Sequence, residues 1–411
     1  MDKYKKTLKL VAQDIDRNER FLHLTPNKSV LSNTARKFQS TRLSDRYYFG
    51  PGESGVMDNG TFTALGLAGV GDITYKAEEA LKKMVGAGVV NLNCLSGIHA
   101  MMCVLLSTTN AGDTVMTLHH NHGGHFATKG IIERAGRKSI DAVFDSTNRE
   151  LDIKATTKVF KNSNAKLFYI DISYITDTID ISKLRSHLGE EALIAYDASH
   201  TIGLIMGEAL PSPLANGVDI MCANTHKTLP GPQKGLIAFK DASYGQKINK
   251  LINSCLFSST HTGSLIALAI TILEMESYGK AYAKQVQNNS QALGEALQTL
   301  GFEVRKNPDG SFSRTHQVHL LTDRLGERRS IYDTLYQNSI ASSFDSPRIQ
   351  NNGNFIRLGT QEITRRGMKE EEMAIIANLI KQALDGKDVK EKVESLKSKF
   401  SSVQFSFDNN I

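Results

Sequence analysis

The chain lacks the features that mark membrane, fibrous or disulfide-rich proteins. Its 411 residues include no tryptophan and only eight prolines, with no internal repeat and no low-complexity segment. The longest apolar stretch, around residues 264–272, is too short to span a membrane. The first residues are charged and helix-like, without the pattern of a signal peptide. We therefore expect a cytoplasmic globular protein.

Cysteine is also scarce. Cys94, Cys103, Cys222 and Cys255 all have apolar sequence neighbours and form no metal-type cluster. Cysteines of this kind are typically buried free thiols, as in proteins of a reducing compartment. The sequence therefore predicts no metal site and no disulfide framework.

Charge of one sign does not dominate, because 49 basic residues face 43 acidic ones and the net charge is +6. Lysine-rich stretches at residues 3–9 and 387–399 also contain apolar residues at helical spacing, which is typical of solvated helix faces. Neither nucleic acid nor a membrane is an expected partner. With 40% hydrophobic residues, the chain is long enough for two domains with separate cores.

The hydrophobic pattern divides the chain into four parts. Residues 1–60 are expected to form an amphipathic helix and an irregular arm, and residues 61–262 an α/β domain. Strands and helices alternate in that domain, which predicts a mostly parallel sheet with right-handed crossovers. Residues 263–300 are expected to form two connecting helices that meet near Gly279, and residues 301–411 a smaller α+β domain. The predicted strands lie at residues 89–92, 115–118, 142–143, 166–170, 193–196, 219–223, 236–239, 302–304, 317–320 and 355–358.

A lysine lies at the tip of a turn between two of these strands. Residues 219–235 read DIMCANTHKTLPGPQKG, so Lys227 follows one apolar run and precedes a turn rich in proline and glycine. Buried strands on both sides would hold the backbone still and remove the side chain partly from water. A desolvated lysine can form a Schiff base. On the His-Lys pair at residues 226–227 alone, however, a solvated lysine in a turn is the commoner outcome.

Polar groups follow other predicted strands. Ser96 and Gly97 open a helix, where free backbone N–H groups suit a phosphate, although these residues also cap helices routinely. Asp197 ends a strand and could keep a pyridine nitrogen protonated, or cap a helix. His122 and His125 have no third metal ligand at convincing spacing, but an imidazole could stack on an aromatic ligand.

Arg357 lies inside an apolar strand, where a buried guanidinium needs a partner. A bidentate clamp on a substrate carboxylate and an internal ion pair both satisfy that need. Together these groups provide a phosphate cradle, a stacking ring, a pyridinium partner, a Schiff-base lysine and a carboxylate clamp. That set is what pyridoxal 5′-phosphate (PLP) requires of a protein.

At these positions the sequence resembles the serine hydroxymethyltransferase family of fold-type I PLP enzymes. The matching stretches occur in family order, at RYYFG (46–50), LSGIHA (95–100), HGGH (122–125), DASHTIGL (197–204), THKTLPGP (225–232) and IRLGTQEITRRGMKEEEM (356–373). The resemblance implies an aspartate aminotransferase-like large domain, PLP as the cofactor and an amino acid as a substrate. It also implies a homodimer whose active sites are built from both subunits.

The resemblance assigns roles residue by residue. Lys227 would hold PLP, Asp197 would bind the pyridine nitrogen, and His125 would stack on the ring; with His200 these are the expected catalytic residues. The residues expected around the cofactor are Ser96, Gly97, Ile98, His125, Ser173, Asp197, His200, His226, Lys227, Thr260 and His261.

The substrate would be held by Arg357 through its carboxylate, with Tyr47 and Tyr48 nearby. Tyr47, Tyr48, Thr260 and His261 would serve the site of the neighbouring subunit.

The sequence departs from the family where folate would bind. Aligned without gaps, Ser40 stands in place of a glutamate that acts as acid and base next to the substrate hydroxyl, and Phe38 in place of a tyrosine. His120 and Phe126 replace the leucines that sandwich the pterin. The phosphate cradle is thinner as well, because Ile98 stands in place of a serine donor.

These departures favour a folate-independent enzyme that cleaves or forms the Cα–Cβ bond of a β-hydroxy amino acid, with an aldehyde co-substrate, as threonine aldolases and transaldolases do. One alternative is a folate-dependent hydroxymethyltransferase in which His120, His122 or Glu53 replaces the missing glutamate. Another is a PLP-binding protein without turnover that acts through partners. The presence of both Lys227 and Arg357 argues against that third possibility.

Overall fold

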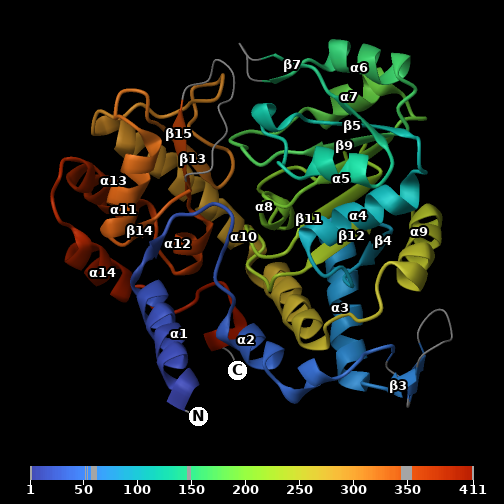
Figure 1. Cartoon of the computed structure of the whole chain (residues 1–411), viewed down its shortest axis with the longest axis horizontal. Helices are drawn as coiled ribbons and strands as arrows, with labels where there is room; N and C mark the ends of the chain where they lie inside the picture. Colours follow the sequence, from blue (N-terminus) through green and yellow to red (C-terminus); the bar gives the residue numbers. More distant parts are fainter. Residues whose placement is uncertain are drawn as a thin grey trace.

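A long helix, α10 (Thr262–Thr299), joins a larger and a smaller part of the protein (Figure 1). The computed structural model describes residues 2–50, 52, 54–56, 63–145, 150–343 and 354–409. The larger part surrounds a seven-stranded sheet, and the smaller part contains the antiparallel pair β13 (Gln317–Leu321) and β15 (Phe355–Gly359). Within these ranges no helix is both long enough and apolar enough to cross a membrane.

The central sheet has the strand order β4-β12-β11-β10-β9-β5-β6. All neighbours are parallel except β12, which runs antiparallel to both β4 and β11. Its strands are β4 (Val89–Asn91), β5 (Thr114–Thr117), β6 (Lys138–Asp141), β9 (Leu167–Asp171), β10 (Leu193–Asp197), β11 (Ile220–Asn224) and β12 (Gly235–Phe239). The predicted α/β class with a mostly parallel sheet is confirmed.

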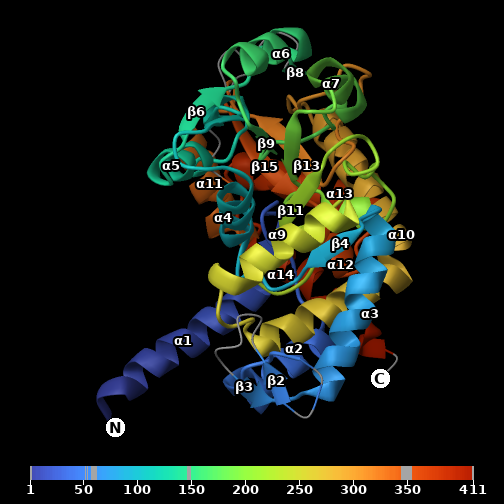
Figure 2. The same cartoon turned by 90° about the vertical axis from the view of Figure 1, so that its right-hand side faces the viewer.

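Helices cover both faces of this sheet, as Figure 2 shows. They are α3 (Ala68–Val85), α4 (Gly97–Thr108), α5 (Thr128–Arg134), α6 (Ile153–Asn162), α7 (Ile181–Leu188), α8 (Ile202–Met206) and α9 (Ala242–Cys255). Side chains of β9 alternate between two cores, because successive residues of a strand point to opposite faces. Phe168 and Ile170 pack with α3, α8 and α10, whereas Leu167 and Tyr169 pack with α4 and α9. Burial on both faces explains why the strand reads as one apolar run.

The expected break between two connecting helices is wrong. Residues 262–299 form one continuous helix, α10, and Gly279 lies within it. A Cβ atom built on Gly207, the residue that follows α8, would collide with the backbone of Gly279. The two glycines therefore allow α8 and α10 to approach closely, and Gly279 does not end the helix.

The smaller part also recruits the N-terminal segment. Strand β1 (Leu22–His23) pairs in parallel with β14 (Ile340–Ala341). The helices here are α11 (Arg328–Gln337), α12 (Gln361–Arg365), α13 (Glu370–Leu384) and α14 (Lys390–Ser398), and the chain continues to η3 (Phe407–Asn409).

Two predicted strands are not formed as expected. The strand at 302–304 is reduced to one bridge between Val304 and Leu320, because the N–H of Phe302 bonds back to the carbonyl of Leu297 in α10. At 142–143 the sheet strand has already ended, and the N–H of Val143 donates to the hydroxyl of Thr156 in α6.

The N-terminal arm is more ordered than the sequence indicates. It contains α2 (Asn33–Gln39), whose Ala35 is fully buried, then η1 (Arg42–Asp45) and the hairpin β2 (Ser54–Val56) and β3 (Thr63–Leu65). Helix α1 (Asp2–Arg20) instead projects from the body with its side chains exposed (Figure 2). The remaining short elements are η2 (His120–His122), β7 (Phe144–Asp145) and β8 (Glu150–Leu151).

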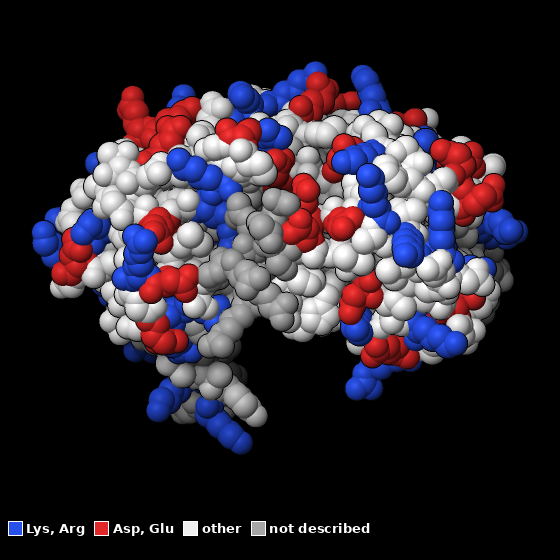
Figure 3. All heavy atoms as spheres, turned by 90° about the horizontal axis from the view of Figure 1, so that it is seen from above, with Lys and Arg blue, Asp and Glu red and all other residues white. Residues whose placement is uncertain are grey.

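Acidic and basic side chains are interspersed over the face that Figure 3 shows. This distribution matches the mixed charge of the sequence.

Candidate active site

Three polar residues end neighbouring parallel strands at one edge of the sheet. Asp171 ends β9, Asp197 ends β10 and Asn224 ends β11, and Asp171 and Asp197 are register partners. Open α/β sheets bind their ligands beyond this edge. A cavity of about 670 Å³ lies there. Its lining includes Ser96, Gly97, Ile98, His125, Ser173, Asp197, His200, His226, Lys227 and Arg357.

The structure thus brings together most of the predicted site residues, but four lie elsewhere. Of the described residues that line this cavity, none is Tyr47, Tyr48, Thr260 or His261. Tyr47 stacks on Phe49 at a centroid distance of 5.5 Å and is 56% exposed. Thr260 and His261 lie just before α10. The roles assigned to these four residues stay predictions.

Lys227 contacts a histidine in the cavity. Its Nζ atom lies 3.0 Å from Nε2 of His200. The neighbouring hydroxyl of Thr228 donates to the carbonyl of His200 at 2.9 Å, which ties the lysine turn to the loop after β10. Burial lowers the pKa of His226 to about 4. His226 is therefore a neutral imidazole at physiological pH.

Asp197 is fixed by two donors. Its Oδ2 accepts from the Tyr169 hydroxyl at 3.1 Å, and its Oδ1 accepts from the N–H of Ser199 at 2.8 Å. Burial raises the pKa of Tyr169 well above its usual value, and the charge of Asp197 acts in the same direction. The phenol stays protonated and keeps donating, so the carboxylate is held in one orientation beside the cavity.

Asp171 is a residue of the site that sequence reasoning missed. It accepts from the N–H of His125 at 3.1 Å, from the Thr117 hydroxyl at 3.3 Å and from the Thr128 hydroxyl. Asp171 therefore fixes the backbone of the predicted stacking residue. Burial lowers the pKa of His125, although the nearby carboxylate of Asp197 acts in the opposite direction. The sequence could have indicated Asp171, because this residue ends a predicted apolar strand in the same way as Asp197 does.

The N-terminus of α4 lines the same cavity and offers an anion site. The Ser96 side chain accepts from the N–H of His99 at 3.1 Å and caps this helix of 12 residues. A Cβ atom on Gly97 would lie 2.8 Å from Cβ of Asn224, so glycine is needed for α4 to approach β11. Free N–H groups and the helix dipole favour a phosphate at such a helix end.

Two buried polar atoms support a bound polar ligand. Among the residues that the structure describes, Asn224 Oδ1 and His226 Nδ1 have no hydrogen-bond partner, and both residues line the cavity. Buried polar atoms normally have partners, so such atoms are expected where a ligand binds. A helix N-terminus, a strand-end carboxylate, an imidazole and a lysine around one cavity fit the phosphate, pyridine ring and aldehyde of PLP.

Arg357 extends from β15 into the same cavity and is 3% exposed. Its guanidinium donates to the Ser173 carbonyl at 3.0 Å and to the Ser343 hydroxyl at 3.1 Å. It also lies 4.4 Å from the centroid of the Tyr174 ring. The smaller part of the protein therefore supplies a well-oriented cation to a site that the larger part builds.

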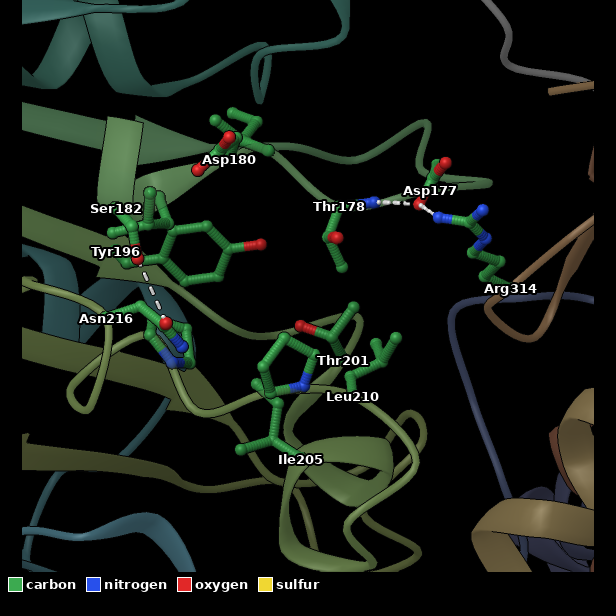
Figure 4. Close-up of a pocket in the computed structure, with 14 residues that line it drawn as sticks. Asp177, Thr178, Asp180, Ser182, Tyr196, Thr201, Ile205, Leu210, Asn216 and Arg314 are labelled. Carbon is green, nitrogen blue, oxygen red and sulfur yellow. Dashed lines mark hydrogen bonds and ion pairs between the residues drawn. The ribbon is translucent and has the colours of Figure 1, made fainter. Parts of the chain in front are cut away.

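A separate cavity of about 350 Å³ lies beside Tyr196 and the loop that begins at Asp177 (Figure 4). Asp177 accepts from Arg314 at 3.3 Å at one side, and Ser182 donates to Asn216 at 3.1 Å at the other. None of the described residues that line this cavity belongs to the predicted PLP site. We therefore place the candidate site at Lys227.

The cysteines depart from expectation in two ways. Cys255 is exposed, because it lies in the last turn of α9, although burial was predicted. Cys94, His99 and Cys103 come together with their ligand atoms within 4.8 Å of one another, so the prediction of no metal-type cluster is wrong. Helix α4 places His99 and Cys103 four positions apart, on one face of the helix.

Both ring nitrogens of His99 are already used in hydrogen bonds to the backbone. Its Nδ1 accepts from the N–H of Leu95 at 3.0 Å, and its Nε2 lies 2.9 Å from the carbonyl oxygen of Leu256. The cluster is therefore satisfied as a hydrogen-bonded group.

The fold and the site together define the class of protein, a fold-type I PLP-dependent enzyme. Residues 2–380 match the profile of the family described as serine hydroxymethyltransferase. The chain belongs to this family.

Curated relatives include a transaldolase and several hydroxymethyltransferases. Fluorothreonine transaldolase of Streptantibioticus cattleyicolor is 34% identical over 381 residues, which cover 91% of this chain and 59% of the relative. The chain thus spans about three fifths of that relative's length. Serine hydroxymethyltransferase of Archaeoglobus fulgidus is 30% identical over 406 residues, which cover 96% of this chain and 88% of the relative.

A solved structure resembles the whole chain. The crystal structure of L-threonine transaldolase from Pseudomonas fluorescens, in the internal aldimine state, matches with a TM-score of 0.89 and 27% identity. The match covers 100% of this chain and 95% of the other. The family and this structure confirm the predicted fold and PLP as the cofactor.

Proposed function

We propose that this protein is a folate-independent aldolase or transaldolase acting on a β-hydroxy amino acid such as L-threonine, with an aldehyde as the co-substrate. The observation that carries this proposal is the mouth of the cavity. His120 and Phe126 line it at the positions where the family resemblance places the leucines that enclose the pterin. Phe126 is 81% exposed, so this side of the site is open. The two transaldolases among the similar proteins support the same activity.

The residues at the floor of the cavity would hold the cofactor. Lys227 would bind it covalently, Asp197 would bind the pyridine nitrogen, His125 would stack on the ring, and Ser96 and Gly97 would bind the phosphate at the start of α4. When bound, PLP supplies the electron sink for the carbon that loses its bond.

The remaining residues would bind and orient the amino acid. Arg357 would clamp the α-carboxylate through two parallel N–H donors, which fixes the direction of the Cα–Cβ bond. As the aldehyde leaves, the β-hydroxyl proton must pass to a base. Burial lowers the pKa of His125, so its imidazole is neutral and able to accept that proton.

Hydroxymethyl transfer to folate is the second candidate, and the hydroxymethyltransferases among the similar proteins favour it. It would require a replacement for the glutamate at the position of Ser40. Of the three candidates, His120 lines the cavity. His122 instead stacks on Phe144 at 4.9 Å and lines a different cavity. Glu53 lies outside the described residues.

The proposed assembly is a homodimer with shared active sites. Tyr47, Tyr48, Thr260 and His261 lie away from their own chain's cavity, as residues that serve a second subunit would. Helix α1 exposes apolar residues that a second copy of the chain could cover, among them Leu8, Leu10, Val11 and Ile15. We also propose a cytoplasmic location, since all four cysteines are free thiols.

Aldehyde exchange tests the proposed function. The holoenzyme is incubated with L-threonine and an excess of a second aldehyde such as benzaldehyde, without folate, and products are separated by mass spectrometry. A new β-hydroxy amino acid that contains the second aldehyde, formed together with acetaldehyde, is the expected result. Lys227→Ala protein provides the background. Formation of product from L-serine only when tetrahydrofolate is present would instead establish hydroxymethyl transfer.

A further inference from the structure

A hydrogen-bonded chain connects Lys227 to an arginine in the smaller part of the protein. From Lys227 Nζ the next atom is His200 Nε2 at 3.0 Å, and His200 Nδ1 lies 3.2 Å from Gln317 Nε2. On its other side, Gln317 Oε1 lies 3.1 Å from His319 Nε2. His319 Nδ1 lies 3.1 Å from Arg305 NH1. His200, Gln317, His319 and Arg305 are each less than 9% exposed, so water does not compete for these bonds.

Two fixed groups determine the direction of every bond in this chain. A guanidinium can only donate, so Arg305 requires His319 Nδ1 to accept and leaves the ring proton on Nε2. The Ser173 carbonyl can only accept, and it lies 3.0 Å from Gln317 Nε2, which fixes the amide orientation. Gln317 therefore accepts from His319 and donates to His200. The proton of His200 must then lie on Nε2, which faces Lys227.

A third group agrees with this direction. His316 Nε2 lies 3.0 Å from the carbonyl of Pro26, so that nitrogen carries a proton as well, and it lies 3.4 Å from His200 Nδ1. The reverse direction would place the Gln317 oxygen against the Ser173 carbonyl and two hydrogen-bond donors between His319 and Arg305. A buried donor or acceptor left unsatisfied costs about 1–3 kcal/mol, so the reverse arrangement is disfavoured at two bonds.

His200 is a neutral imidazole with one ring proton, because the groups around Lys227 disfavour a second proton on its ring. The titratable and charged groups that face the lysine from the packed elements are His125, Asp197, His200, His226, His316 and Arg357. Burial is the largest cause that lowers the pKa of His200 well below its usual value, and the nearby charge of Arg357 acts in the same direction. His200 therefore has a single ring proton.

We infer that Arg305, His319 and Gln317 are positioning residues that present His200 Nε2–H to Lys227, so that the lysine amino group must offer its lone pair and is held in the neutral, nucleophilic form. An ammonium group has no lone pair and could not accept this bond. The chain would thereby prepare Lys227 to condense with the aldehyde of PLP, forming a C=N bond while the aldehyde oxygen leaves as water with the two protons of the neutral amine. The inference rests on PLP as the cofactor, and it is independent of which amino acid or aldehyde reacts.

The test is the rate at which apoprotein captures PLP, followed by the visible absorption of the bound cofactor across pH 6 to 10. In the Gln317→Glu variant, an ionised carboxylate can no longer donate to His200, so the His200 proton moves to Nδ1 and Lys227 becomes the donor. We expect the profile to move to higher pH by about one unit or more, which is about tenfold slower capture at neutral pH.

Two variants at Arg305 form the matched pair. Arg305→Lys keeps a group that can only donate and should retain the wild-type profile, whereas Arg305→Met removes the donor and should give a smaller shift to higher pH. A Gln317→Glu profile that coincides with the wild type would overturn the inference. Equal shifts of the pH profile in both Arg305 variants would also overturn the inference. Such shifts would come from the change in side-chain packing and not from the loss of a hydrogen-bond donor.

A measurement on unaltered apoprotein avoids any loss of folding in the variants. In ¹⁵N NMR spectra of protein with labelled histidine, the ring signals of His200 are assigned as those missing from the His200→Asn variant. Their chemical shifts should show the neutral form with the proton on Nε2. The neutral Nδ1–H form would contradict the inference. Neither measurement requires an amino acid, so a protein that passes both but shows no aldehyde exchange would refute only the proposed function.

Discussion

The floor and the mouth of the same cavity are built in opposite ways. At the floor, Asp171, His200 and Arg357 are each at most 5% exposed, and each has two or more hydrogen-bond partners. At the mouth, Phe126 is 81% exposed. The floor retains the residues that PLP needs, whereas the mouth differs at the positions that the family uses for folate. We propose that the floor determines the cofactor and that the mouth determines the reaction partner.

The largest expected effect is at the centre of the floor. Lys227→Ala should abolish the visible absorption band of bound PLP and reduce aldehyde release by about a thousandfold or more, because Lys227 is the one lysine among the described residues that line the cavity. Absorption spectra and aldehyde release are measured on the same preparation. A visible band that survives in the variant would show that the lysine is misassigned.

Arg357 tests whether the smaller part of the protein contributes to the floor. In Arg357→Ala, loss of two charge-assisted hydrogen bonds, each contributing about 1.5–3 kcal/mol, should weaken amino acid binding roughly a hundredfold or more. PLP binding should change little, since the cradle lies on α4 and the strand ends. The two affinities are titrated separately, and equal losses would indicate a structural role for the arginine.

The buried histidines of the floor should make the protein sensitive to acid. His226 has a folded pKa of about 4, below its unfolded value near 6.5, so between these values the unfolded chain binds a proton that the folded chain does not. The unfolding free energy should therefore fall as pH drops through this window, by up to about 1.4 kcal/mol per pH unit for this group.

The measurement for His226 is urea unfolding of the apoprotein at several values of pH. His226→Asn should have a smaller slope than the wild type between pH 6.5 and 4. Identical slopes in the two proteins would contradict the assignment of a neutral, partly buried imidazole at this position.

The smallest expected effect is at the mouth. Changing His120 and Phe126 together to leucine restores the residues that the resemblance expects around a pterin. Threonine cleavage should change less than about tenfold, because these side chains do not hold the cofactor or the carboxylate, and PLP binding should be unchanged. A loss as large as that of Lys227→Ala would show that the mouth takes part in the chemistry and would remove the contrast between the two regions.

The sequence was sufficient where function depends on residues that end a strand or open a helix. Asp197, Lys227 and Ser96 follow apolar runs, and the structure places all three at one cavity. The local sequence pattern was not sufficient to predict that α10 is one continuous helix. Gly279 allows a close contact with Gly207, which no short stretch of sequence reveals.

Gln317 and Asp171, which contact predicted site residues from distant segments, were not found from the sequence. Gln317 and His200 are 117 positions apart, and Asp171 and His125 are 46 positions apart. Neither pair has a periodicity or a motif, and both depend on how β13 and β9 pack against the loops that follow other strands. The cluster of Cys94, His99 and Cys103 was missed for a different reason, because His99 and Cys103 have an i,i+4 spacing in a predicted helix and this spacing was not used.

The most direct test compares turnover of L-threonine and L-serine by the holoenzyme, each with and without tetrahydrofolate. We expect L-threonine to release acetaldehyde at a rate that tetrahydrofolate does not change, with L-serine turned over more slowly under both conditions. Saturable stimulation of L-serine turnover by tetrahydrofolate, to a rate above that of L-threonine, would contradict the proposed folate-independent function.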